Sequence, residues 1–344
     1  MTKAPRPPVH HIDPVLVEVT RGTLVESVHR GAAVVCGADG VLLSAWGDIE
    51  RAVFPRSAVK PLQALPLLET GAAEHFALSE AELALACASH SGQDVHVRGV
   101  RAWLDRLGLS EADLECGSHP PLSPEAARAL TLSGRTPSPV HNNCSGKHCG
   151  MLTTARHMRE PTRGYIAADH PVQQRIAQVL GEMTDCMPQH TPSATDGCGI
   201  PTFALPLSAV ALAMARLAAP DGLGPVRGQA ASKILAAMTV HPDLVAGDGR
   251  LTTLVMRAVP GLILKGGAEG VYAAVVPGKR LGIALKIDDG AGRAAEVAIL
   301  ALLRHLGVLS GAEEDSLAEC SAPAVCNIAG QPVGVVRAAP EWLG

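Results

Sequence analysis

The sequence predicts a mixed α/β fold of the α+β kind, in which a mainly antiparallel sheet packs against a helical body. Two observations lead to this fold class. β-Rich runs occupy about residues 15–54 and again 262–340, and residues 57–260 between them carry mostly helical patterns. Strands from the two ends of the chain would then meet in one sheet. Since no linker or internal repeat divides the chain, we expect one domain over 15–344, after a flexible, Pro-rich segment at 1–14.

The individual elements follow in chain order. Three N-terminal strands are indicated by β-branched runs between glycines and polar turns: VLVEVTRG, LVESVHRGAAVVCG and GVLLSAWGD. Helical spacing follows, and Ser79 with Glu82 forms a capping box in front of ELALACASH. Further helices are expected at 148–159, 171–184, 203–218, 229–239 and 291–306. The returning strands are GLILKGG, GVYAAVVPG, RLGIALKIDD and PVGVVRA.

Composition excludes several classes of function. The 344 residues are 47% hydrophobic and 18% charged, with a net charge of −4 and only 2% aromatic residues, so we expect a globular protein with no nucleic-acid partner. The most apolar stretch, 203–219, is short for a membrane span and contains Arg216, so no membrane association is expected. No secretory signal is recognisable, and nine cysteines are an odd number. Reduced thiols and a cytoplasmic location are therefore expected.

The first chemical motif lies near the start of an apolar helix, in PRSAVKPLQALPLLETG. Ser57 and Lys60 are three positions apart, so both lie on one helical face. A serine hydroxyl becomes a nucleophile when a neighbouring base removes its proton, and a lysine can be that base when burial or the charge of Arg56 lowers its pKa. The alternative is a solvated lysine near a helix start, because this short pattern also arises by chance.

Two further stretches add to this motif. Ser89 lies in the polar SHSG that follows an apolar helix, and Lys265 lies in KGG at the end of a strand-like run. Taken singly, the first stretch favours a helix end closed by Gly92, and the second is equally well a tight turn. Together with Ser57 and Lys60, however, they are typical of the serine and lysine motifs of penicillin-recognising enzymes, in the same chain order.

Cysteines form the last candidate group. Cys144 and Cys149 lie in HNNCSGKHCG, and Cys198 lies in TDGCG, each beside glycines. Two thiolates at one site would favour zinc. The spacing matches no structural zinc module, so small buried thiols are the alternative.

Five stretches in this order carry a family resemblance: RSAVKPLQALPLLETGAA, ELALACASHSG, HNNCSGKHCGML, ATDGCGIPTFALPLSAVALAMARLA and KGGAEGV. Over about residues 15–335 the chain resembles the asparaginase II family, the Rhizobium etli-type asparaginases. The resemblance implies hydrolysis of L-asparagine to L-aspartate and ammonia, a homodimer, and a fold related to serine β-lactamases and glutaminases.

The resemblance also implies a set of site residues. It pairs Ser57 with Lys60 and Ser89 with Lys265 for catalysis, and it implies zinc on Cys144, Lys147 and Cys198. The substrate-binding residues that it implies are Arg56, His90, His148 and Asp196.

The expected mechanism is acyl transfer through Ser57 with Lys60 as base, and Ser89 and Lys265 relaying a proton to the leaving ammonia. Zinc would place the substrate. The open alternatives are a β-lactamase-like or penicillin-binding enzyme, a glutaminase-type amidohydrolase, and a non-catalytic binding protein with the same fold.

Overall fold

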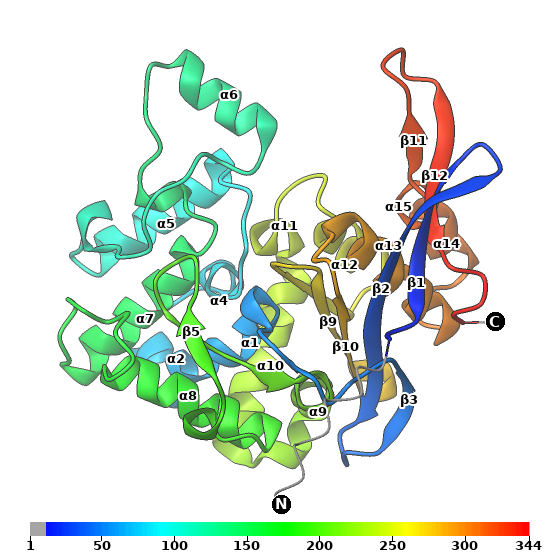
Figure 1. Cartoon of the computed structure of the whole chain (residues 1–344). Coiled ribbons are helices and arrows are strands. Elements are labelled where there is room, and N and C mark those ends of the chain that lie inside the picture. The colour runs from blue at the N-terminus through cyan, green and yellow to red at the C-terminus, as the bar shows by residue number, and fades with distance from the viewer. Residues whose placement is uncertain (1–11, 344) are drawn as a thin grey trace, which may run out of the picture.

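The computed structural model describes residues 12–343, and in it strands from both ends of the chain form one antiparallel sheet beside a helical body (Figure 1). The strand order is β11-β12-β1-β2-β10-β9-β8, and β3 pairs with β2. The strands of this sheet are β1 (Val15–Arg21), β2 (Leu24–Gly37), β3 (Leu42–Trp46), β8 (Ile263–Gly267), β9 (Val271–Val276), β10 (Leu281–Ile287), β11 (Ala324–Cys326) and β12 (Pro332–Ala338). The predicted fold class is thereby confirmed.

Strands that follow one another in the chain pair as hairpins, such as β1 with β2 and β9 with β10. β2 then connects the N-terminal and C-terminal strands in one sheet. β2 pairs through Leu24–Arg30 with β1 and, further along, through Gly31–Gly37 with β10. β9 and β10 are almost continuously buried runs of Val, Ala, Leu and Ile, which requires cover on both faces of the sheet. The helices α9 (Leu207–Ala218) and α13 (Gly292–His305) both contact β9 and β10 and supply that cover.

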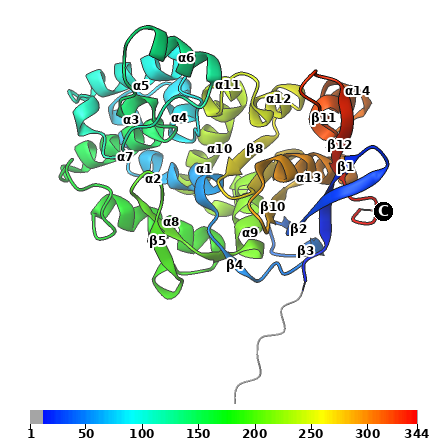
Figure 2. The same cartoon turned by 45° about the horizontal axis from the view of Figure 1, so that its top comes forward.

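The helical body is built from the central part of the chain. Its helices are α1 (Lys60–Gln63), α2 (Leu65–Glu69), α3 (Ala72–His75), α4 (Glu80–Ala86), α5 (Asp94–Arg106), α6 (Pro124–Leu132), α7 (Ser145–Met158), α8 (Pro171–Thr184), α10 (Pro225–Val240), α11 (Pro242–Val245) and α12 (Leu251–Ala258). Two short helices, α14 (Gly311–Ser316) and α15 (Ala318–Ser321), follow α13. Figure 2 shows α1 and β8 at the junction of the helical body and the sheet.

Two local predictions can be compared with the structure. The capping box at α4 is confirmed, since Ser79 accepts a hydrogen bond from the Glu82 backbone and the Glu82 carboxylate accepts one from the Ser79 backbone. The helix expected at 203–218 begins only at Leu207, because the preceding residues pair as the short strands β6 (Pro201–Phe203) and β7 (Leu205–Pro206). β6 pairs with β5 (Ser193–Thr195), and β7 with β4 (Ala52–Val53).

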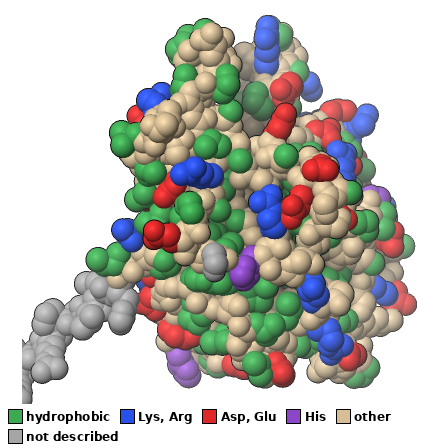
Figure 3. Space-filling model, turned by 90° about the vertical axis from the view of Figure 1, so that its right-hand side faces the viewer, with side chains coloured by type: hydrophobic (Ala, Val, Ile, Leu, Met, Phe, Trp, Pro, Cys, Tyr) green, Lys and Arg blue, Asp and Glu red, His purple; other side chains and the backbone are tan. Residues whose placement is uncertain are grey.

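The predicted flexible segment, 1–14, lies outside the described residues except for its last three. Of these, Asp13 is buried, and its carboxylate accepts a hydrogen bond of 2.7 Å from the Asp48 backbone and pairs with Arg51. In the described part of the chain no helix has the length and apolarity needed to cross a membrane. Figure 3 shows basic and acidic side chains interspersed over one face of the molecule.

Replacing Gly282 on β10 with alanine is expected to lower the free energy of unfolding by about 3 kcal/mol, because the new methyl group would overlap α9. A Cβ at this position would collide with the backbone of Ala211 and Ala215, and would lie 2.8 Å from the carbonyl carbon of Met214. Urea unfolding measures the change. Gly278→Ala is the matched control, since nothing lies within 4 Å of a Cβ there. Equal stability of the two variants would contradict this account of the helix–sheet contact.

Candidate active site

Ser57 lies in a short helical turn, η1 (Arg56–Val59), at the junction of the sheet and the helical body. Ala58 and Val59 bury the inner face of this turn, so that Ser57 remains half-buried. The preceding residue, Arg56, has a φ of 51°, a left-handed conformation that is costly for a residue with a side chain. Such strain occurs where the surrounding structure fixes the backbone for a functional purpose. Ser57 is therefore held in a defined place.

The glycines after Lys265 bring β8 against this turn. A Cβ added to Gly267 would lie 2.6 Å from the Pro55 carbonyl oxygen and 3.3 Å from the Ala58 nitrogen. Only glycine allows the strand to come so near. The two motifs that are far apart in the sequence, around Ser57 and around Lys265, therefore share one wall of the site.

The Ser89 hydroxyl lies between two buried lysines. Lys265 Nζ donates to Ser89 Oγ over 2.8 Å, and Lys60 Nζ donates to the same oxygen over 3.1 Å. Lys60 also donates to the carbonyl oxygens of Ala88 and Asn143, and Lys265 to that of Gly266. One hydroxyl can accept two such bonds and donate one. The three side chains thus form a connected path along which a proton can move.

The pairing of serines and lysines differs from the one predicted, because both lysines contact Ser89. Among the described residues no hydrogen bond joins Ser57 to Lys60, although the two side chains are only three positions apart. A buried ammonium group needs acceptors for its three N–H donors, and the end of α4 with the loop before α7 offers them. Lys60 is accordingly turned toward Ser89, which therefore has two lysine partners.

Burial lowers the pKa of both lysines. Lys60 and Lys265 are almost fully buried, and desolvation disfavours their charged forms. For Lys265 the charge of Lys60 acts in the same direction, and its pKa lies well below that of an exposed lysine. Neutral amines, which can accept a proton, are therefore accessible at this site.

Cys144, Lys147 and Cys198 come together beside this lysine pair. Cys144 precedes α7, Lys147 lies in its first turn, and Lys147 Nζ is 3.2 Å from the sulfur of Cys198. A hydrogen bond from Cys198 holds the pKa of Cys144 well below its usual range, and the charges of Lys147 and Lys60 lower it further. A thiolate is thus available, which suits zinc. Because no three His, Cys, Asp or Glu side chains of residues 12–343 meet as a ligand group, a metal here would need Lys147 as its third ligand.

The four predicted substrate-binding residues are buried or paired around this cysteine group. Arg56 Nε donates to the Asp196 carboxylate over 2.6 Å, and the charges of Lys147 and Arg56 outweigh burial and lower the pKa of Asp196. His90 is joined to Ser145 Oγ over 2.8 Å. His148 Nδ1 is joined to the Tyr165 hydroxyl over 2.7 Å, and its Nε2 has no hydrogen-bond partner among residues 12–343. Burial lowers the pKa of both histidines, which favours their neutral forms.

A cavity of about 220 Å³ opens onto the two serines. Ser57, Ser89 and Lys265 line it, and none of the four predicted substrate-binding residues does. Its wall also contains Arg250, Thr252, Tyr272 and Glu296, which the sequence patterns did not single out. Glu296 could have been noticed as the one acidic residue of α13, at the start of a long apolar run.

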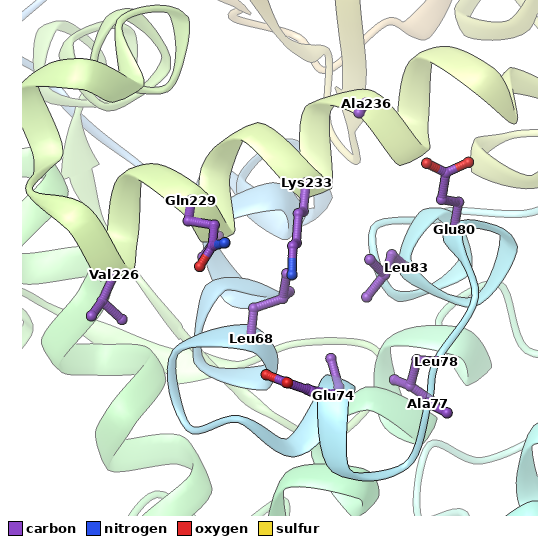
Figure 4. A pocket seen from close by; sticks show the side chains of 12 residues that line it. Leu68, Glu74, Ala77, Leu78, Glu80, Leu83, Val226, Gln229, Lys233 and Ala236 are labelled. Carbon is purple, nitrogen blue, oxygen red and sulfur yellow. The ribbon is translucent and has the colours of Figure 1, made fainter.

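A larger cavity, of about 630 Å³, lies between α10 and the segment from α2 to α4 (Figure 4). Its lining includes Lys233, Glu74 and Glu80, and none of the predicted catalytic, substrate-binding or metal-binding residues. The smaller cavity is therefore the one that the serine–lysine chemistry can use.

An antiparallel sheet, a helical body and a serine held between two buried lysines define a hydrolase of the acyl-serine type. The model of the L-asparaginase II family matches residues 17–338, and the chain belongs to this family. A comparison with curated proteins found no match.

Among solved structures, the chain is similar to a β-lactamase from Mycobacterium bovis, with 15% identity, a TM-score of 0.40, and coverage of 85% of this chain and 95% of that one. It is also similar to the D-alanine carboxypeptidase AmpC from Burkholderia cenocepacia, with 14% identity, a TM-score of 0.40, and coverage of 81% and 93%. A third similar structure is a mutant of the simvastatin synthase LovD from Aspergillus terreus, with 13% identity, a TM-score of 0.37, and coverage of 80% and 93%.

Proposed function

We propose that this protein hydrolyses L-asparagine to L-aspartate and ammonia through a covalent intermediate on Ser57. The observation that carries the proposal is the Ser89 hydroxyl, hydrogen-bonded to Lys60 and Lys265 in the cavity that Ser57 also lines. Membership of the L-asparaginase II family supplies the substrate class.

In the first half-reaction Ser57 Oγ attacks the carbon of the side-chain amide and its proton passes to the neutral amine of Lys60. The C–N bond then breaks, and the departing nitrogen takes the proton of the Ser89 hydroxyl. Lys60 returns its proton to Ser89, so the proton of Ser57 is finally carried away on ammonia. Lys265 donates a hydrogen bond to Ser89 Oγ and so holds this hydroxyl in position for the proton relay.

In the second half-reaction a water molecule attacks the aspartyl ester. Lys60 accepts the proton of the water and gives it to Ser57 as the ester bond breaks, which restores the starting state. The oxyanion of both half-reactions needs preorganised donors. The Ser57 backbone N–H is one, because the first N–H groups of a helical turn have no acceptor within that turn.

Zinc belongs to the proposal as an ion on Cys144, Lys147 and Cys198, with Lys147 as a neutral amine. When bound it supplies a Lewis acid and a fixed positive charge near the substrate. The ionised thiol of Cys144 fits such a site, and the charge of Lys147 would have to be lost on binding.

Ammonia release from L-asparagine, with L-glutamine and a chromogenic β-lactam as parallel substrates, tests the proposed function. We expect turnover of asparagine that exceeds turnover of glutamine, and no cleavage of the lactam. Cleavage of the lactam alone would assign the chain to the β-lactamase-like alternative. Light scattering on the same sample measures the proposed homodimer.

Removing the metal is expected to destabilise the protein. Dialysis against a strong chelator should release about one zinc per chain and lower the free energy of unfolding by about 3 kcal/mol, the value for a ligand present at about 100 times its Kd. Elemental analysis and thermal melting measure both quantities. Cys198→Ala should lose the metal and Cys320→Ala should keep it. Retention of zinc by Cys198→Ala would contradict the ligand assignment.

A further inference from the structure

The catalytic cavity contains two charged side chains of opposite sign, Arg250 and Glu296, that come from different parts of the fold. Arg250 immediately precedes α12, and Glu296 lies in the first turns of α13. Both line the cavity that Ser57, Ser89 and Lys265 also line. Both are half-buried.

Neither of these charges is neutralised by an ion pair. Within residues 12–343 every ion pair closer than 4.0 Å involves other side chains, so Arg250 and Glu296 are paired neither with each other nor with a third residue. Half-buried charges without an ion-pair partner lose part of their hydration with little compensation. A ligand that carries the complementary charges would supply this compensation.

The neighbours of the two charges indicate that they are held for such a ligand. Burial raises the pKa of Glu296, and the charge of Arg250 together with a hydrogen bond from Tyr272 offsets part of this effect. The ring of Tyr272 is fixed in turn, because it packs over Gly266, where an added Cβ would lie 3.1 Å from the ring. Arg250 is close enough to Lys265 for its charge to lower the pKa of that lysine. Arg250 therefore lies on the side of the cavity that contains Lys265.

We propose that Arg250 binds the α-carboxylate and Glu296 the α-ammonium group of the substrate, and that this pair selects amides with a free amino-acid head group. A guanidinium group can hold a carboxylate through two parallel hydrogen bonds, and a carboxylate accepts the N–H donors of an ammonium group. With the head group bound by this pair, the side-chain amide lies in the cavity that contains Ser57. The inference rests on the proposed function and refines it.

This assignment moves recognition of the head group away from the cysteine group. The predicted residue Arg56 already donates to Asp196, whereas Arg250 has no such partner. Arg250 and Glu296 also line a second cavity, of about 440 Å³. Of these two cavities Glu319 lines the second and not the first, which makes it a matched control for Glu296.

Substrate analogues that lack one charged group provide the test. Succinamate is L-asparagine without the α-ammonium group, and β-alaninamide is L-asparagine without the α-carboxylate. Arg250→Met should lower kcat/KM for L-asparagine about 30-fold or more, mainly through KM, and leave that for β-alaninamide unchanged. Glu296→Gln should lower kcat/KM for L-asparagine to a similar extent and leave that for succinamate unchanged. Arg257→Met and Glu319→Gln, as surface controls, should alter neither.

An equal loss on all three substrates in Arg250→Met would show a structural role and overturn the proposal, as would an unchanged KM for L-asparagine. Calorimetric titration with L-aspartate separates this inference from the proposed function. If the native protein binds L-aspartate and Arg250→Met does not, the head-group site stands even where no ammonia is released. If the native protein binds no L-aspartate and turns over no L-asparagine, both proposals fail.

Discussion

Ser57→Ala is expected to lower kcat for L-asparagine by about 10⁴-fold or more, because the atom that carries the acyl group is lost. Ser89→Ala should slow the reaction by about 10²–10⁴-fold, the contribution typical of a proton-transfer group. The difference follows from the proposed roles: Ser57 carries the acyl group, and Ser89, which accepts hydrogen bonds from both lysines, relays a proton. Ammonia release gives both rates.

Intact-protein mass spectrometry distinguishes the roles of the two serines. After rapid quenching, the native protein and Ser89→Ala should carry an added aspartyl group, and Ser57→Ala should carry none. Ser232→Ala on the outer part of α10 is the control and should behave as the native protein does. An aspartyl group found on Ser89, or turnover retained by Ser57→Ala, would reverse the assignment of nucleophile and proton relay.

Lys60→Met is expected to lower kcat by about 10²–10⁴-fold, since the proposed base is removed. The fold should survive this change, because methionine fills a similar volume and replacing a buried ionisable group by an apolar one is often neutral for stability. Thermal melting and ammonia release are measured on the same sample. Activity should be lost while the melting temperature stays close to that of the native protein.

The control for this lysine is Lys233→Met, an exposed position on α10, which should keep full activity. A Lys60→Met variant that is stable and fully active would remove Lys60 from the mechanism. One that is unfolded is replaced by Lys60→Gln, which retains hydrogen-bond donors for the carbonyl groups of Ala88 and Asn143.

Much of the fold could be predicted because its signals are local. The buried runs of β9 and β10 are continuous in the sequence, and the capping box at Ser79 is complete within four residues. The start of α9 was predicted four residues too early, because Phe203 to Pro206 are apolar in either structure and only pairing with β4 and β5 makes them strands.

For the candidate site, the sequence predicted the residues but not the contacts between them. Ser57, Lys60, Ser89 and Lys265 follow from motifs, but Ser89 and Lys265 are 176 positions apart, and no local pattern specifies which lysine meets which serine. Glu296 belongs to none of the motifs that the sequence analysis identified. An acidic residue on an amphipathic helix normally faces water, and only the packing of α13 against the sheet places this one at the cavity.

The sequence by itself determined the chemical groups, the order of strands and helices, and the membership of a family. Tertiary structure alone decided that Lys60 turns to Ser89, that Gly267 lets β8 approach η1, and that Arg250 and Glu296 face the same cavity as Ser57. The physical reason is the same in each case. Periodicity and caps depend on neighbours within a few residues, whereas burial and the choice of hydrogen-bond partners depend on which distant segments pack together.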